Sequence, residues 1–182
     1  MNIKQKTGFT LIELMVVISI IGILSAVLYA NFSDARAQSR DKVRMSALKE
    51  VQLALEFYKA QNGVYPAQGC GTPGSNWAGK GPHSATWGAP CDMYITGLVP
   101  DFISSLPTDP TSEYVDNKGY LYMTNTSRTA YKLLAHNVVE KLLVTSYDDE
   151  FARCPMSYGT LWCGTIPQSN SYAVYSAGAE TW

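Results

Sequence analysis

Apolar residues are concentrated near the start of the chain. Residues 9–30 read FTLIELMVVISIIGILSAVLYA and contain a single charged residue, Glu13. As a helix this run would be about 33 Å long, close to the thickness of the hydrocarbon core of a bilayer. Lys4 and Lys6 precede it without an acidic residue, which predicts a cytoplasmic N-terminus and a remainder in the periplasm or outside the cell.

Two interpretations of this run are conventional. A secretory signal peptide would use the lysines as its charged region and Ala35-Arg36-Ala37 as a cleavage candidate. Its apolar region is normally shorter, about 7–15 residues, and contains no carboxylate. A plain signal anchor would hold an unrelated domain at the membrane.

The third interpretation follows from Glu13. A carboxylate at that depth costs about 2.5–3.5 kcal/mol and needs a partner, which we do not expect within the apolar run itself. A cut between Gly8 and Phe9 would create an ammonium group at Phe9, four residues before Glu13. The two charges could neutralise each other along one helix face or between neighbouring chains. The same cut would remove both lysines of the cytoplasmic flank.

The segment KxKTGFTLIEL, residues 4–14, resembles the class III leader and cleavage site of type IV pilins and of the pseudopilins of type II secretion. The resemblance implies that a prepilin peptidase removes residues 1–8 and that Phe9 is N-methylated. It also implies that Glu13 aligns subunits through the Phe9 amine of a neighbour. Other pilin subunits and the inner-membrane pilus assembly machinery would be the further partners.

The helix is predicted to continue to Asn62, because residues 31–62 contain neither proline nor glycine and Gly63 follows. Apolar residues recur there at spacings of three and four and favour packing against a sheet over a free coiled coil. They are Val43, Ala47, Val51, Ala54, Leu55 and Tyr58. Arg36, Arg40 and Arg44 form a basic row, which is either a solvated face or a contact with lipid headgroups or neighbouring subunits.

Residues 63–182 are predicted to form the globular head of an α+β protein, in which a long N-terminal helix packs on an antiparallel sheet of three or four strands. The composition of residues 63–93 predicts a loop. A helical turn is expected within residues 94–106, strands at 119–125, 129–137 and 171–176, and no clear element at 138–148. The segment SLPTDP, residues 105–110, with the tyrosines that follow it, resembles a segment of pseudopilins and many pilins.

Four cysteines lie in the predicted extracytoplasmic part, where an even number favours disulfides over zinc, and no CxxC motif or neighbouring histidine supports a zinc site. The sequence leaves three pairings open, and proximity favours Cys70–Cys91 and Cys154–Cys163. The second bridge would enclose PMSYGTLW, similar to the C-terminal disulfide loop of many type IV pilins.

Charge and candidate chemistry point away from catalysis. Removal of the leader would leave 12 basic and 15 acidic side chains, which indicates no specific nucleic-acid partner. His83 and His136 lie in no recognisable catalytic motif, so we expect no enzyme, cofactor or metal centre. Asp109, Asp116 and residues 148–150 are candidates for calcium ligands, but a solvated acidic loop is the favoured explanation.

Three functions therefore compete. The first is a structural subunit of a type IV pilus, held in the inner membrane by a single span before assembly and exposed on the cell surface afterwards. The second is a pseudopilin of a type II secretion system. The third, from another class, is a membrane-anchored extracytoplasmic binding or enzymatic domain with an uncut N-terminus.

Overall fold

The computed structural model describes residues 8–71, 73–74, 76–79, 92–111, 118–159, 163 and 167–182. Within these residues it contains one long helix and a four-stranded antiparallel sheet, which confirms the predicted α+β class. The chain forms two compact units, Met1–Ala37 and Gln38–Trp182. The sheet belongs entirely to the second unit.

Helix α1 runs from Leu11 to Asn62. The prediction that Gly63 ends it is confirmed. Gly63 adopts a φ of 77° and donates its N–H to the carbonyl of Lys59 at 2.8 Å. Glycine suits this left-handed position because it has no Cβ. Within the described part of the chain, no helix combines the length and the apolar character needed to cross a membrane.

The sheet has the order β1-β2-β3-β4, and all neighbouring strands are antiparallel. Asn125 closes the turn between β2 and β3, since its Oδ1 accepts the N–H of Thr129 at 2.8 Å. The three predicted strands are confirmed, whereas β1 lies within the predicted loop. The strands are β1 (Ala78–Gly79), β2 (Gly119–Thr124), β3 (Tyr131–His136) and β4 (Tyr172–Tyr175).

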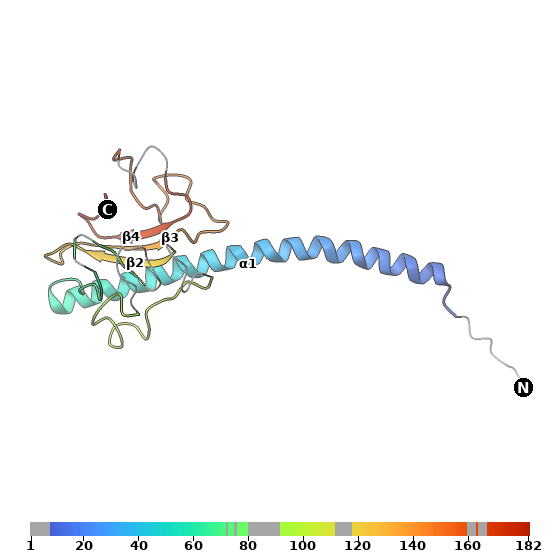
Figure 1. Cartoon of the computed structure of the whole chain (residues 1–182), viewed down its shortest axis with the longest axis horizontal. Helices are drawn as coiled ribbons and strands as arrows, with labels where there is room; N and C mark the ends of the chain where they lie inside the picture. The colour runs from blue at the N-terminus through green and yellow to red at the C-terminus, as the bar shows by residue number, and fades with distance from the viewer. Residues whose placement is uncertain are drawn as a thin grey trace, which may run out of the picture. The chain divides into compact units, whose positions relative to one another are not determined.

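One face of the sheet packs against the second half of α1 (Figure 1). Leu48, Val51 and Leu55 of the helix are fully buried there, among sheet residues such as Tyr122. The predicted apolar stripe is wrong at Val43, whose exposed fraction is 54%. Arg44 lies one residue further on, roughly 100° round the helix, and takes the buried direction instead.

The opposite face of the sheet is also covered, by Trp77 and by the C-terminal segment. Leu121, Met123 and Leu134 are buried on this side. Strands with two covered faces need no alternation of apolar and polar residues, which explains why GYLYMT and YKLLAH do not alternate.

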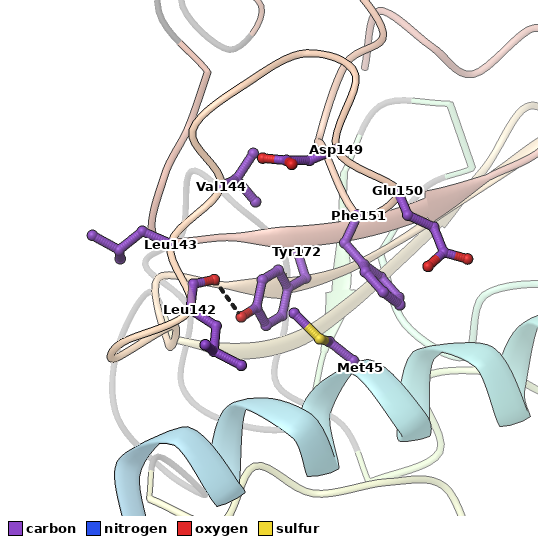
Figure 2. A pocket seen from close by; sticks show the side chains of 8 residues that line it. All are labelled: Met45, Leu142, Leu143, Val144, Asp149, Glu150, Phe151 and Tyr172. Carbon is purple, nitrogen blue, oxygen red and sulfur yellow. Dashed lines mark hydrogen bonds between the residues drawn. The ribbon is translucent and has the colours of Figure 1, made fainter. Parts of the chain in front are cut away.

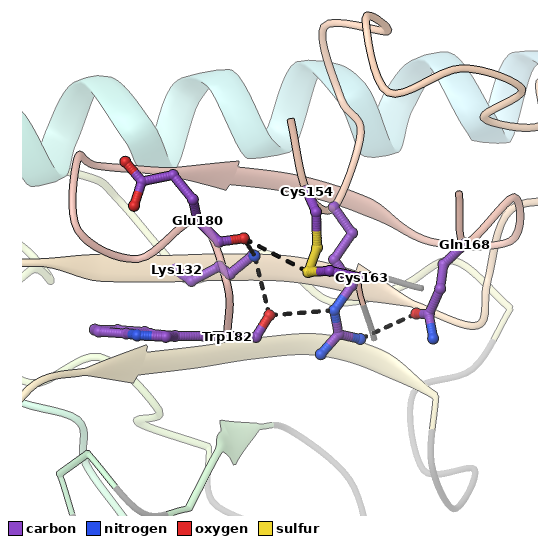
Figure 3. Close-up of a disulfide and its surroundings, with 7 residues drawn as sticks. Lys132, Cys154, Cys163, Gln168, Glu180 and Trp182 are labelled. Carbon is purple, nitrogen blue, oxygen red and sulfur yellow. Dashed lines mark hydrogen bonds between the residues drawn. A yellow bond between two sulfur atoms is a disulfide. The ribbon is translucent and has the colours of Figure 1, made fainter. Parts of the chain in front are cut away.

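Lys132 is fully buried on the same face. Its Nζ donates to the main-chain carbonyls of Glu180 and Trp182, both at 3.0 Å (Figure 3). The same Nζ lies 4.7 Å from the centre of the Tyr175 ring. Burial, together with the nearby Arg153, lowers the pKa of Lys132 to about 7. These contacts fasten residues 180–182 to the middle of the sheet.

The loops around the sheet meet the remaining expectations in part. The expected helical turn in 94–106 is a single turn, in which the N–H of Phe102 reaches the carbonyl of Leu98 at 3.0 Å. Residues 138–148 form no strand. Gly69 packs so closely on the chain that a Cβ there would lie 1.6 Å from the carbonyl oxygen of Met93.

Candidate assembly site on the N-terminal helix

The first turn of α1 is organised by Thr10 and Glu13. The Oε2 of Glu13 accepts the N–H of Thr10 at 2.8 Å and its hydroxyl at 2.7 Å. The N–H of Glu13 in turn reaches the Thr10 hydroxyl oxygen at 3.3 Å. This is a capping box, in which two residues three apart satisfy donors that the first helical turn leaves open.

The capping box corrects one step of the sequence argument. We expected no partner for the Glu13 carboxylate within the apolar run, and Thr10 supplies one. The motif, threonine followed three residues later by glutamate ahead of an apolar run, is visible in the sequence. Glu13 is therefore satisfied before any neighbouring subunit is present.

The helix that follows the capping box presents apolar side chains on all sides. Their exposed fractions run from 49% at Val17 to 76% at Leu11, and Phe9 before them is 89% exposed. Ser19 lies between these apolar residues, and its hydroxyl donates to the carbonyl of Met15 at 2.7 Å. A helix that is apolar all round is buried in its working state. The exposed set is Leu11, Ile12, Leu14, Met15, Val16, Val17, Ile18, Ile20, Ile21, Ile23 and Leu24.

The basic row of α1 divides into three environments. Arg36 is exposed. Arg40 donates from Nε to Glu140 at 2.8 Å and forms a second, very short bond with the same carboxylate. Arg44 is fully buried, so the expectation of a solvated or lipid-facing position is wrong for this residue. Arg44 can be buried because carboxylates within the head contact its guanidinium.

Three acidic residues surround the Arg44 guanidinium. Its Nε lies 2.6 Å from the Oδ2 of Asp109, and its Nη1 contacts Asp41 at 2.8 Å and Glu140 at 2.9 Å. Nη2 donates to Thr111 as well, at 2.9 Å. Burial opposes the charge of Arg44, but the hydrogen-bonded carboxylates outweigh it and raise its pKa.

Hydrogen bonds of the same network also hold the acidic side chains in place. Hydrogen bonds from Arg40, and then from Arg44, lower the pKa of Glu140 to about 2, although burial acts in the opposite direction. Asp41 also accepts main-chain N–H groups from residues 140, 141 and 142, the shortest at 2.7 Å. We call Asp41, Arg44, Asp109 and Glu140 the ion cluster. It ties α1 to two distant segments, 107–111 and 138–142, and sequence analysis missed it, having named Asp109 only as a calcium candidate.

The C-terminal disulfide is confirmed. Cys154 and Cys163 are bonded, with their Cα atoms 5.7 Å apart, and the Sγ of Cys163 lies 3.7 Å from the carbonyl oxygen of Glu180 (Figure 3). Cys70 is also disulfide-bonded. Its expected partner Cys91 lies outside the described residues, so the pairing of Cys70 stays a prediction.

The candidate catalytic and metal residues that the structure describes do not converge. His136 is buried on β3, with its Nδ1 3.4 Å from the hydroxyl oxygen of Ser171. His83 and Asp116 lie outside the described residues. Among the described residues, no group of three His, Cys, Asp or Glu side chains has the arrangement of a metal site. Asp149 uses its carboxylate to accept the N–H groups of Thr145 and Ser146 in a turn.

Comparison with known proteins supports the methylated N-terminus. Residues 3–29 match the family model described as the prokaryotic N-terminal methylation motif. The type II secretion system core protein G of Pseudomonas aeruginosa is 39% identical over 67 residues, which cover 37% of this chain and 47% of that protein.

Two type IV pilus proteins are similar to the same extent. The wide pilus major component PilA4 of Thermus thermophilus is 42% identical over 62 residues, 34% of this chain and 47% of that protein. The major pilin PilE1 of Neisseria gonorrhoeae is 37% identical over 89 residues, 47% of this chain and 41% of that protein. The chain thus spans less than half the length of these curated relatives. No solved structure matches it significantly.

The methylation motif, the relatives and the α+β architecture agree on a class of structural proteins that carry a methylated N-terminal helix. These findings support an assignment of the chain to the type IV pilins and type II secretion pseudopilins, with the similarity concentrated in the N-terminal helix.

Proposed function

We propose that this chain is a structural subunit of a type IV pilus, which polymerises through its N-terminal helix after removal of residues 1–8. The observation that carries the proposal is the apolar surface of residues 11–24, which is exposed on all sides and contains a lone carboxylate, that of Glu13, in a capping box. Burial of apolar surface contributes about 25 cal/mol per Å² relative to water, so this surface must be covered by lipid before assembly and by neighbouring helices afterwards. The prediction that residues 9–30 lie in the inner membrane before assembly belongs to this proposal.

Glu13 would set the register of the polymer. Cleavage before Phe9 creates an ammonium group, and N-methylation retains its charge. A charge-assisted bond between an ammonium and a carboxylate is roughly twice as strong as a neutral hydrogen bond. The Glu13 carboxylate would therefore exchange a Thr10 donor for the Phe9 amine of a neighbouring subunit. Prepilin peptidase and the inner-membrane assembly machinery are the implied partners.

Two substitutions separate the charge of Glu13 from its capping role. Glu13→Gln keeps a side-chain oxygen for the capping box but removes the charge, so we expect assembly to be lost. Thr10→Val removes the hydroxyl and weakens the helix start by about 0.5–2 kcal/mol, but leaves the carboxylate, so filaments should persist. Glu50→Gln, at an exposed position of the same helix, is the matched control.

The measurement is the yield of sheared surface filaments, with mass spectrometry of the N-terminus. A mature chain that begins with methylated Phe9 is the expected result. Normal filament yield from Glu13→Gln, or a functional chain that still begins at Met1, would contradict the proposal. The latter would favour a membrane-anchored binding or enzymatic domain.

A type II secretion pseudopilin is the second candidate function. The relatives named type II secretion system core protein G favour it, and so does the SLPTDP segment, whose Asp109 belongs to the ion cluster. Deletion of the gene separates the two functions. Loss of surface filaments with normal protein secretion supports the pilus, and the reverse result supports the secretion system.

A further inference from the structure

A groove of about 420 Å³ opens beside α1 in the head. Figure 2 shows that Met45 comes from the helix and Tyr172 from β4. The Tyr172 hydroxyl already donates to the Leu142 carbonyl at 2.6 Å, so the floor of the groove is mainly apolar. Leu143 on its wall has an exposed fraction of 47%. The apolar lining is Met45, Leu142, Leu143, Val144, Phe151 and Tyr172.

One end of the groove is acidic. Asp149 and Glu150 line it, and the exposed Asp148 precedes them. Lys49 pairs with Glu150 at 2.6 Å, but this pair is exposed to solvent. Residues 142–151 themselves contain three acidic residues and no lysine or arginine. In Figure 2, Leu142 and Leu143 lie on the opposite side of the groove from Glu150. The groove therefore favours an apolar partner that carries a cation at one end.

The chain itself contains a segment of this chemistry. Tyr29 and Phe32 on α1 are 81% and 60% exposed, and Arg36 is exposed as well. Positions 29, 32 and 36 have the i, i+3, i+7 spacing by which an amphipathic helix enters a groove. Asp34 lies roughly 160° round the helix from both Phe32 and Arg36, so it is directed away from this face.

We propose that the groove of one subunit binds the Tyr29, Phe32 and Arg36 face of a second copy, with Arg36 at the acidic end. The proposal rests on the filament function and names one of its contacts. Because the two surfaces differ, the contact is heterologous, and its repetition from copy to copy generates an open helical polymer instead of a closed dimer. Rim charges of opposite sign would fix the register of the contact.

Cysteine cross-linking in filaments tests this contact. A chain with Phe32→Cys and Leu143→Cys should give a ladder of covalent multimers on oxidation, in non-reducing gels. Among the described residues there is no free cysteine to add background. The control chain carries Leu53→Cys and Leu143→Cys, since Leu53 is equally exposed, at 59%, but lies elsewhere on α1. A ladder from the control and not from the test pair would overturn the contact.

A charge exchange tests the same contact without cysteines. Arg36→Glu and Asp148→Lys, each alone, should lower filament yield about tenfold, and the two together should restore it. Asp148 is chosen because the Asp149 carboxylate already holds a turn. Full yield from both single variants, or no rescue by the pair, would overturn the contact. Failure of the unmodified chain to form filaments would instead overturn the proposed function.

Discussion

Replacement of Arg44 by methionine is the most direct test of how the head is held to its helix. The change keeps the aliphatic length of the side chain but removes every bond to the ion cluster. Asp41 and Asp109, whose side chains are 0% and 1% exposed, would then lose their buried cation. Removal of one partner from a buried ion pair typically costs 3–5 kcal/mol, because a charge stays buried without compensation.

The expected loss lies at the low end of that range. Asp41 keeps the N–H groups of residues 140–142, and Asp109 keeps the N–H and hydroxyl of Thr111, at 2.9 Å each. We therefore expect the free energy of unfolding to fall by about 3 kcal/mol, which is a large share of the 5–15 kcal/mol of a typical domain.

The measurement is urea unfolding of the full chain in detergent at pH 7, followed by tryptophan fluorescence. Arg36→Met, at an exposed position of the same row, should change stability by less than about 0.5 kcal/mol. Because the Arg44 cluster is buried, 0.5 M salt should leave the difference between the two variants nearly unchanged. A loss below about 1 kcal/mol for Arg44→Met would refute the argument that the buried acids depend on this guanidinium.

Three further predictions concern the head. The pKa of Glu140 is lowered to about 2, so its contribution of about 1–3 kcal/mol is present above pH 4.5 and is lost as the pH falls toward 2. Urea unfolding at pH 6 and pH 3 should show a smaller pH effect in Glu140→Gln, and an unchanged effect would contradict this. Replacement of Cys154 and Cys163 by serine should cost about 3 kcal/mol and lower Tm by about 6–12 °C, which calorimetry measures. Chemical reduction of the native chain should lower Tm in the same direction. Gly69→Ala should cost about 1–3 kcal/mol in urea unfolding, because its Cβ would overlap a carbonyl oxygen 1.6 Å away. Gly22→Ala, where no atom lies within 4 Å of the added Cβ, should not be destabilising.

The long helix and the sheet could be predicted because their signals are local. Gly63 ends the helix through its own backbone conformation, and strands β2, β3 and β4 each form a short run of β-favouring residues. The small strand β1 could not be predicted, because Ala78 and Gly79 become a strand only by pairing with Leu121 and Tyr122.

The ion cluster could not be predicted for the same physical reason. Asp41 and Arg44 are three residues apart and give a recognisable local pair. Asp109 and Glu140 reach Arg44 from 65 and 96 positions further along the chain. A basic residue every four positions indicates an exposed face only if nothing acidic folds onto it. The tertiary structure therefore converts one member of an apparent surface row into part of the core.

The capping box changes the physical account of assembly. If Glu13 had no partner in the free subunit, relief of an uncompensated charge would drive polymerisation. With Thr10 as its partner, the carboxylate has already been stabilised, and a neighbour contributes only the difference between an ammonium and a neutral donor. Because the helices would leave lipid and not water, most of the driving force must then come from close van der Waals packing of the apolar side chains of residues 11–24, which have no register of their own. Glu13 would thus set the axial register between neighbouring helices, whereas the apolar surface makes them associate.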